Sequence, residues 1–199
     1  EARRVYGRII ESRVPNGRFE VHHEPVGIAA AFTAWNFPAA LIARKVAPAL
    51  AAGCSVIVRP SSQTPGVAMV MIDCCRAGNL PAGAFNLVTG PTDATYKPIM
   101  ESKLVRKVSL TGSTRVGQQM IRDAAATMKK VSMELGGNAP VIVFSDADIE
   151  AALNVAVPTK FANAGQVCVT GDRFYIHESI HDRFVEGFVG RAKAIKLGN

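Results

Sequence analysis

Three short segments of the sequence hold residue types that could do chemistry. Gly165-Gln166-Val167-Cys168 presents a cysteine, whose thiolate is a nucleophile. Thr33-Ala34-Trp35-Asn36-Phe37-Pro38 presents an amide between two aromatic rings. Thr111-Gly112-Ser113-Thr114-Arg115-Val116-Gly117 presents small residues, which let a backbone approach a phosphate at the start of a helix. These segments are the first candidates for a catalytic or binding site.

Each segment also has a purely structural interpretation. Asn36 could cap a helix that Pro38 begins, while the aromatic rings fill the core. The glycines of the third segment could serve helix packing, since the first glycine of the familiar dinucleotide fingerprint is missing. A lone cysteine such as Cys168 is more often a small buried apolar residue. A cysteine hydrolase pair with His177 or His181 is disfavoured, because the alternation around both histidines indicates a surface strand and helix.

The elements that must position these residues alternate between strands and helices. The apolar run from Val26 to Thr33 is typical of a strand buried on both sides, and Pro38 begins a helix that reaches about Ala52. Such alternation predicts an α/β fold with a Rossmann-like, doubly wound parallel sheet, which binds ligands beyond the carboxyl ends of its strands. The pattern continues with strand 55–58, helix 64–76, strand 84–88, helix 94–101, strand 106–110, helix 113–128 and strand 130–133.

Two further regions flank this sheet. Before it, residues 1–13 are predicted to be the end of a helix, and 19–23 a strand that follows the turn at Pro15-Asn16-Gly17. After Glu134 a second α/β unit begins, with too few strands to close a domain. Its predicted elements are strand 140–144, helix 148–162, strand 173–177 and helix 180–194.

The composition is typical of a globular protein: of 199 residues, 48% are hydrophobic and 20% are charged. The basic residues behind the net charge of +7 are scattered, which argues against nucleic-acid binding and still favours anionic cofactors and substrates. The four cysteines have neither zinc nor disulfide spacing, so we expect no metal and a cytoplasmic location. We expect no membrane span, because Arg44 and Lys45 interrupt the apolar region, and no signal peptide.

Taken in order and spacing, the motifs resemble those of the aldehyde dehydrogenase superfamily, over residues 1–199. The matching runs are Trp35-Asn36-Phe37-Pro38, Thr111-Gly112-Ser113-Thr114, Met133-Glu134-Leu135-Gly136-Gly137 and Gly165-Gln166-Val167-Cys168. The resemblance implies an N-terminal region ending in an oligomerisation-type strand (1–26), a Rossmann-like NAD(P)-binding domain (27–133) and the first, incomplete part of a catalytic domain (134–199). It also implies that the full-length protein is a homo-oligomer.

The resemblance assigns catalytic roles to four residues. Cys168 would attack the aldehyde carbon, and the Asn36 amide would donate to the resulting oxyanion together with the Cys168 backbone N–H. Hydride transfer to the nicotinamide would leave a thioester, which Glu134 would hydrolyse by activating water. Lys45 would support proton transfer. Glu134 could instead be a surface carboxylate before a Gly-Gly turn, and Lys45 a solvated helix residue.

The same resemblance indicates NADP or NAD as the cofactor. Arg59 and Ser62 stand where the family usually has lysine and glutamate at the adenosine ribose. A neutral hydroxyl and a guanidinium accept the extra phosphate of NADP better than a carboxylate does, so NADP is predicted to be accepted and NAD stays open. The residues expected at the cofactor are Thr33, Ala34, Trp35, Arg59, Ser61, Ser62, Gly90, Thr111, Gly112, Ser113, Gly117, Leu135 and Gly136.

Within the superfamily, the runs Ile42-Ala43-Arg44-Lys45 and 106–117 most resemble succinate-semialdehyde dehydrogenases. Arg44 would reach the distal carboxylate of the substrate, and Phe37 would line the substrate site. That branch often has a second arginine at the position of Ala162, so another aliphatic semialdehyde is a further possibility.

Two alternatives to an oxidoreductase stay open. The same cysteine site could hydrolyse activated esters without a cofactor, or the chain could be an inactive cofactor-binding fragment. We expect a central fragment because family members are more than twice as long and because the later Glu-x-Phe-Gly-Pro segment, which holds the nicotinamide ribose, is absent. Such a fragment would expose apolar surface.

Overall fold

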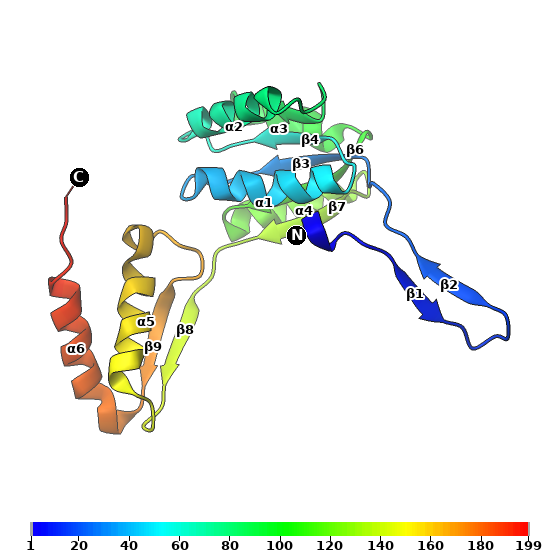
Figure 1. Ribbon diagram of the computed structural model, residues 1–199. Coiled ribbons are helices and arrows are strands. Elements are labelled where there is room, and N and C mark those ends of the chain that lie inside the picture. The colour runs from blue at the N-terminus through cyan, green and yellow to red at the C-terminus, as the bar shows by residue number, and fades with distance from the viewer. Residues whose placement is uncertain (1, 199) are drawn as a thin grey trace. The chain divides into compact units, whose positions relative to one another are not determined.

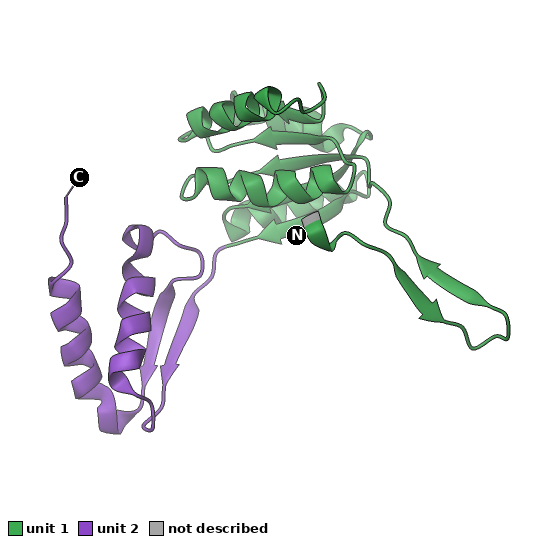
Figure 2. Ribbon diagram, viewed as in Figure 1, with its two compact units in different colours: residues 1–135 green, residues 136–199 purple. Residues whose placement is uncertain are grey.

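The computed structural model describes residues 2–198 and divides into two compact units, residues 1–135 and 136–199 (Figure 2). Each unit has its own cluster of buried apolar side chains. What the sequence predicts for Glu1 and Asn199 lies outside the described residues.

A five-stranded parallel sheet forms the centre of the first unit (Figure 1). Its strands lie in the order β5-β4-β3-β6-β7, and each neighbouring pair is parallel. The middle strand, β3, is buried along most of its length, as its continuous apolar run predicts. The predicted α/β class with a doubly wound sheet is confirmed. The elements are β3 (Ile28–Phe32), α1 (Pro38–Ala51), β4 (Val56–Arg59), α2 (Pro65–Ala77), β5 (Phe85–Leu87), α3 (Thr92–Glu101), β6 (Val105–Thr111), α4 (Thr114–Ala125) and β7 (Lys130–Glu134).

The strand order reverses between β3 and β6. From β3 the chain moves outward through β4 to β5, and then returns to place β6 and β7 on the other side of β3. In an open parallel sheet, the crevice beside such a reversal, at the carboxyl ends of the strands, is where ligands bind. The turns that follow β3 and β6 therefore occupy the ligand edge of this sheet.

Helices cover both faces of the sheet. On one face, Leu110 of β6 packs in a core with Met120 of α4 and with residues of α3. On the other face, Ala31 of β3 packs with Ile42 and Val46 of α1, and with residues of β4 and α2. Because alternate residues of a strand point to opposite faces, the run of apolar residues in β3 serves both cores.

The N-terminal segment differs from its prediction as the end of a helix. Within residues 2–13, only η1 (Ala2–Arg4) is helical, as a short 3₁₀ turn, and β1 (Arg8–Glu11) pairs antiparallel with β2 (Arg18–Val21). The turn explains the difference: Asn16 has a φ of 61°, and the Gly17 backbone N–H donates to the Val14 carbonyl at 2.9 Å. This turn closes a hairpin, and the β-branched Ile9 and Ile10 suit the strand that pairs across it.

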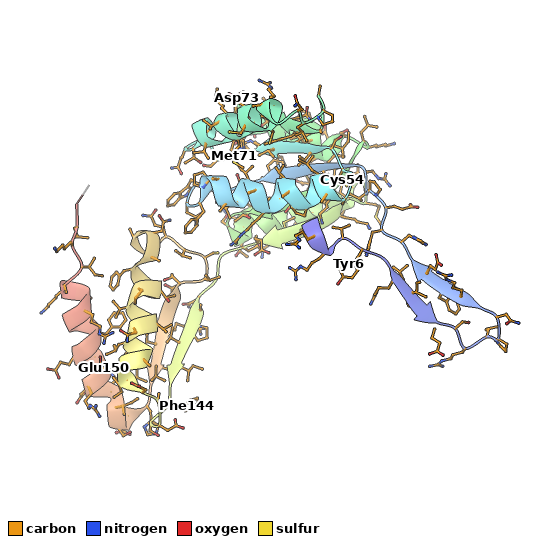
Figure 3. The ribbon with its side chains drawn as sticks, in the orientation of Figure 1. Tyr6, Cys54, Met71, Asp73, Phe144 and Glu150 are labelled. Atoms are coloured by element: carbon orange, nitrogen blue, oxygen red, sulfur yellow. The ribbon has the colours of Figure 1, made fainter. Side chains whose placement is uncertain are left out.

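The second unit contains two parallel strands and two helices. A core of apolar residues from both helices and both strands includes Leu153 and Phe184. Glu150 of α5, labelled in Figure 3, accepts a hydrogen bond from Arg191 of α6 and so joins the two helices. The elements are β8 (Ala139–Val143), α5 (Ile149–Phe161), η2 (Ala162–Gly165), β9 (Gly171–Ile176), η3 (Glu178–Ile180) and α6 (His181–Lys193).

Three properties of the described residues bear on the chemistry. None of the helices within residues 2–198 has the length and apolar character that a membrane crossing requires. The same residues include no group of three or more His, Cys, Asp or Glu side chains that could hold a metal ion. All four cysteines are free thiols; Cys54 is buried and is labelled in Figure 3, whereas Cys74 and Cys168 are exposed.

Candidate functional site

Three of the predicted motifs in the first unit meet at the ligand edge of its sheet. Phe32 at the end of β3 lies beside Leu110 of β6, so the turns that follow these strands are neighbours. Thr111 pairs with Glu134 at the end of β7, and the Gly112 N–H donates to the Glu134 carbonyl at 3.0 Å. The Asn36 turn, the Thr111 turn and the Glu134 carboxylate therefore share one edge.

The turn after β3 places Phe37, and not Asn36, at the N-cap position of the next helix. Helix α1 begins at Pro38 with Phe37 at the N-cap position, and the Phe37 side chain makes no capping hydrogen bond. Trp35 and Phe37 are 45% and 37% exposed, so the aromatic rings do not fill the core either. Pro38 begins the helix as predicted, whereas the prediction that the aromatic rings fill the core is wrong. The turn presents polar and aromatic side chains at the ligand edge.

Thr33, at the start of this turn, contains a buried polar atom without a partner. Its backbone N–H donates to the Arg59 carbonyl at 3.3 Å, which joins the ends of β3 and β4. Its hydroxyl oxygen is buried and makes no hydrogen bond within residues 2–198. A buried hydroxyl without a partner costs about 1–3 kcal/mol. A polar ligand group at this edge would supply that partner, so Thr33 fits a cofactor-binding position.

The turn after β6 begins helix α4 with a conventional cap. The Ser113 hydroxyl accepts a hydrogen bond from the Val116 N–H at 3.3 Å. A Cβ atom added at Gly117 would lie 2.6 Å from Cδ2 of Leu135, so the glycine lets α4 pack against the segment after β7. Of the residues predicted to contact the cofactor, Gly117 and Leu135 thus have this packing contact in the structure.

The end of β4 forms one side of a pocket of about 280 Å³. Arg59 Nε donates to Thr95 Oγ1 at 2.8 Å, and Nη2 donates to Thr92 Oγ1 at 2.9 Å and to the Gly90 carbonyl at 3.4 Å. These bonds orient the guanidinium along the start of α3. The pocket brings together four residues predicted at the cofactor. Its lining is Arg59, Pro60, Ser61, Ser62, Pro65, Thr89, Gly90 and Pro91.

Two larger cavities contain none of the predicted site residues. One of about 580 Å³ lies between α2 and β5 and is lined by residues that include Cys75 and Arg76. The other, of about 350 Å³, lies in the second unit among aromatic residues of α5, β9 and α6. Size alone therefore does not identify the site, and the smaller pocket at the end of β4 has the better claim because it lies at the carboxyl ends of strands.

Lys45 projects from α1 onto the sheet, where its Nζ donates to Ser109 Oγ at 2.7 Å. Burial lowers the pKa of Lys45 from 10.5 to about 8; the nearby Glu134 carboxylate opposes this shift, and the Lys107 ammonium adds to it. Lys45 is half-buried and bonded, so it is not a freely solvated helix residue. The adjacent Arg44 is exposed.

In the second unit, Cys168 is exposed and not a buried apolar residue. It lies in a turn that the Thr170 N–H closes by donating to the Val167 carbonyl at 3.1 Å. The Thr170 hydroxyl is within 3.2 Å of the Thr159 carbonyl and 3.3 Å of the Lys160 carbonyl, which fastens the turn to the end of α5. The thiol is therefore accessible on a well-anchored turn.

The segment before this turn has an uncommon backbone. Asn163, Ala164 and Gly165 have φ values of 49°, 56° and 77°, all in the left-handed region. For a residue with a Cβ this conformation costs roughly 1–2 kcal/mol, and such strain is often found at functional sites. The strained residues lie just before the candidate nucleophile.

The histidines are separated from Cys168 by strand β9. Cys168 precedes this six-residue strand and His177 follows it, so a length of roughly 17 Å of extended chain lies between them. His177 instead caps η3, where its Nδ1 accepts from the Ser179 N–H at 3.2 Å, and His181 pairs with Asp182. This agrees with the prediction that neither histidine forms a hydrolase pair with the cysteine.

Sequence reasoning missed three residues that contact the predicted ones: Ser109, Thr92 and Thr95. The alternation of Lys107, Ser109 and Thr111 within a predicted strand could have indicated one shared face. It could not have shown which helix covers that face. The threonines stand on α3, whose position relative to Arg59 depends on the packing of the whole sheet.

Comparison with known proteins agrees with these motifs. The model of the aldehyde dehydrogenase family matches residues 1–199. Over all of its length the chain is 50% identical to 3-sulfolactaldehyde dehydrogenase of Pseudomonas putida and 48% identical to succinate semialdehyde dehydrogenase of Acinetobacter baylyi. A solved Escherichia coli structure described as an NADP dependent enzyme superposes on the whole chain with a TM-score of 0.94 and 44% identity. The chain spans 41% of the length of each of these three proteins. The chain belongs to the aldehyde dehydrogenase family.

Proposed function

We propose that the protein oxidises an aldehyde to a carboxylic acid with NADP or NAD. The observation that carries the proposal is the shared edge of the sheet, where the Asn36 turn, the Thr111 turn and Glu134 meet beside the strand-order reversal. An amide donor, a phosphate-binding turn and a carboxylate at one ligand edge suit a cofactor-dependent reaction at a carbonyl. The family to which the chain belongs supports the same reaction.

The proposed reaction begins with the Cys168 thiolate, whose sulfur forms a bond to the aldehyde carbon while the carbonyl π electrons move to oxygen. The Asn36 amide and the Cys168 backbone N–H donate to this oxyanion, and one such donor contributes about 3–4 kcal/mol to the transition state. The nicotinamide of a bound cofactor would supply the hydride acceptor. Loss of hydride from the same carbon leaves a thioester on Cys168.

Glu134 then acts as general base for hydrolysis. Its carboxylate removes a proton from water, the water oxygen bonds to the thioester carbon, and the carbon–sulfur bond breaks to release the acid and restore the thiolate. The exposed position of Glu134 at the end of β7 supports access to water. Lys45, half-buried with its pKa lowered to about 8, assists the transfer of that proton.

The cofactor fits the first unit by the chemistry of its residues. The partnerless Thr33 hydroxyl accommodates a polar group, and the capped start of α4 presents N–H groups to an anion. The remaining donors of the Arg59 guanidinium, on Nη1, suit the extra phosphate of NADP, and Ser62 carries no opposing charge. The further proposed contacts with the cofactor are Ala34, Trp35, Ser61, Gly90, Thr111, Gly112, Gly117, Leu135 and Gly136.

The proposed substrate is an aldehyde that carries a distal anionic group, with succinate semialdehyde as the leading candidate. The two relatives compared above are named for 3-sulfolactaldehyde and succinate semialdehyde, each of which combines an aldehyde with an acid group. Arg44 is exposed on α1 and could pair with that group, and Phe37 offers an apolar surface near Asn36.

We also propose a homo-oligomer with a cytoplasmic location. Residues 8–20 of the β1–β2 hairpin leave large apolar side chains in solvent, including Ile9 at 70% and Phe19 at 56% exposure, which suits a contact with a second subunit. Sedimentation of the full-length protein tests this contact, because Ile9→Lys should lower the mass of the assembly. The four cysteines form no disulfide within residues 2–198, which suits a reducing compartment.

The full-length protein with succinate semialdehyde and NADP or NAD provides the test of the reaction. Wild-type protein should turn over many times, measured by the absorbance of the reduced cofactor. Glu134→Gln should form about one equivalent of reduced cofactor per site and then slow, because the thioester accumulates. Glu178→Gln, which changes an exposed carboxylate elsewhere, is the matched control. Full turnover in Glu134→Gln would contradict the proposed role of Glu134. No oxidation of succinate semialdehyde by wild type would contradict the proposed substrate, and no oxidation of any semialdehyde would contradict the function.

A further inference from the structure

The face of β6 and β7 that lies beneath α1 is polar. Lys107, Ser109 and Thr111 of β6 alternate with the buried Val108 and Leu110, which belong to the core on the opposite face. In the neighbouring strand, Ser132 pairs with Ser109 and Glu134 pairs with Thr111. Paired residues of parallel neighbours point to the same face. Two serines and a carboxylate therefore occupy adjacent positions on one face.

Helix α1 delivers Lys45 to this face. Ile42 and Val46 of α1 pack on Ala31 of β3, which lies beside Ser109 in the sheet. Lys45 stands between those two anchors in sequence, and its Nζ donates to Ser109 Oγ at 2.7 Å. The contact joins residues 64 positions apart and fixes the end of a side chain that is otherwise flexible.

A second, parallel contact lies beside the first. Lys107 Nζ donates to Ser132 Oγ at 2.6 Å, so each serine accepts from a different lysine. The two pairs differ in their setting: Lys45 is half-buried and its pKa responds to Glu134, whereas the Lys107–Ser132 pair is exposed. Ser132 thus offers an internal control for Ser109.

We propose that Ser109 is a positioning residue, which holds the Lys45 side chain on the β6–β7 face so that Lys45 can take the proton that Glu134 removes from water. This inference rests on the proposed function. In the step, a proton passes from the protonated Glu134 carboxyl, by way of water, to the neutral amine of Lys45, which becomes an ammonium and later releases the proton to solvent. No electrons are exchanged, and Ser109 only accepts a hydrogen bond.

The charges around Lys45 make this role feasible. Burial is the largest influence on the pKa of Lys45 and lowers it to about 8. A substantial fraction of the side chain is therefore a neutral amine, which can accept a proton, at mildly alkaline pH. Glu134 of β7 raises the pKa and Lys107 of β6 lowers it, while β3 carries no charged residue. The other charged residues on α1 and on the elements around it are Arg44 of α1, Arg3 and Arg4 of η1, Arg59 of β4, Asp73 and Arg76 of α2, Arg106 of β6 and Lys130 of β7.

Removal of the Ser109 hydroxyl should free the Lys45 ammonium to reach water. Loss of the acceptor by itself would lower the pKa of Lys45, but burial is the largest influence on that pKa, so greater hydration should outweigh the lost hydrogen bond and raise the pKa from about 8 toward 10.5. Ser109→Ala removes the acceptor, Ser109→Thr keeps it in a residue suited to a strand, and Ser132→Ala removes the parallel acceptor of Lys107.

The test measures the titration of Lys45 directly, in the full-length protein. Trace acetylation with acetic anhydride at a series of pH values, read by mass spectrometry of the peptide that contains Lys45, reports the fraction of neutral amine without any need for catalysis. The pH dependence of thioester hydrolysis is then measured for the same proteins. In Ser109→Ala both midpoints should move upward and hydrolysis at pH 8 should fall severalfold, whereas Ser109→Thr and Ser132→Ala should match wild type.

The outcomes separate this inference from the function beneath it. If wild type oxidises the aldehyde, and Ser109→Ala has the same acetylation midpoint and the same hydrolysis midpoint as wild type, only the inference about Ser109 is overturned. An upward shift of the acetylation midpoint without a shift of the hydrolysis midpoint also overturns it, because Lys45 then takes no part in the proton transfer. If wild type lacks oxidation, the proposed function fails, and the role of Ser109 in it fails too, whatever the labelling gives.

Discussion

Arg59 at the end of β4 is tied to Thr95 of α3, because its Nε donates to the threonine hydroxyl at 2.8 Å. The hydroxyl in turn reaches the Pro91 and Thr92 carbonyls at 3.0 and 3.2 Å. Thr95 is buried and Arg59 lines the pocket, so a buried residue sets the direction of a side chain that faces a ligand. The guanidinium is thus ordered before any cofactor binds.

This order predicts an effect of Thr95→Val on cofactor choice. Loss of a hydrogen bond to a charged group costs about 1.5 kcal/mol, so NADP should bind roughly tenfold more weakly. NAD, which lacks the extra phosphate, should change less. Titration calorimetry of both cofactors measures the difference, and Thr95→Ser, which keeps the hydroxyl, should retain NADP binding. An equal loss for both cofactors would show that Arg59 does not recognise the extra phosphate.

Alkylation should distinguish the two exposed thiols. Iodoacetamide should abolish aldehyde oxidation through Cys168, and Cys168→Ala should lower the rate by roughly a thousandfold or more. Cys74 is also exposed but stands on α2, and Cys74→Ala should leave both the rate and the inactivation by iodoacetamide unchanged. Peptide mapping identifies the modified residue. Retained oxidation in Cys168→Ala would rule out the proposed nucleophile.

Gly117→Ala should destabilise the first unit, because the added Cβ would lie 2.6 Å from Cδ2 of Leu135. Overpacking of this kind costs about 1–3 kcal/mol. Leu135→Ala in the same protein should recover part of that loss, and urea unfolding of the single and double variants measures the coupling. Gly66→Ala is the control: it lies in α2 with no atom within 4 Å of the added Cβ, and should be neutral or slightly stabilising. If the effects of Gly117→Ala and Leu135→Ala on the free energy of unfolding were additive, the contact between these two positions would be contradicted.

Ala164→Gly should stabilise the second unit by roughly 0.5–1 kcal/mol. Its φ of 56° strains alanine but not glycine. Relief of this strain should outweigh the entropic cost that glycine adds by making the unfolded chain more flexible. Ala156→Gly in the buried face of α5 should instead destabilise by about 1 kcal/mol or more. Thermal unfolding compares the two. A loss of stability in Ala164→Gly would mean that the alanine methyl makes contacts that outweigh the strain.

Lys45→Met should change the dependence of stability on pH. The folded pKa of about 8 lies below the unfolded value of 10.5, so between these values the unfolded chain binds more protons and wild-type stability rises with pH. Methionine removes the cost of burying the charge, so the variant should be more stable than wild type below pH 8. This difference in the free energy of unfolding should shrink as the pH rises from about 8 to 10.5. Lys130→Met, at an exposed lysine, should follow wild type. Parallel curves for Lys45→Met and wild type would contradict the lowered pKa.

Much of the fold follows from local patterns in the sequence. The sequence predicts that the helix beginning at Pro38 reaches about Ala52, and the helix ends at Ala51; the strand predicted over 106–110 spans Val105–Thr111. Proline, caps and apolar periodicity act within a few residues, which is why they can be interpreted from a single chain. The N-terminal helix is wrong because the conformation of β1 depends on its pairing with β2 across a turn.

The site could be predicted only in part. The order and spacing of the motifs match a family, and this match predicts catalytic roles for Cys168, Asn36 and Glu134. The Lys45–Ser109 contact joins a helix to a strand 64 positions away, and the sequence does not state which strand lies beneath α1. That depends on the order β4-β3-β6, in which β6 inserts on the far side of β3. Which side chains complete a site is therefore decided by tertiary packing.

The strand order also has a consequence for how the first unit folds. Ile28 of β3 pairs with Val105 of β6, a residue made 77 positions later, whereas β1 and β2 meet across a short turn. β4 is made soon after β3, but at about 5–20 residues per second β3 would wait roughly 4–15 seconds during synthesis before its second partner, β6, emerged. The hairpin closes early and the central seam of the sheet closes late, so β3, which is almost wholly apolar, is the segment most open to aggregation in the nascent chain.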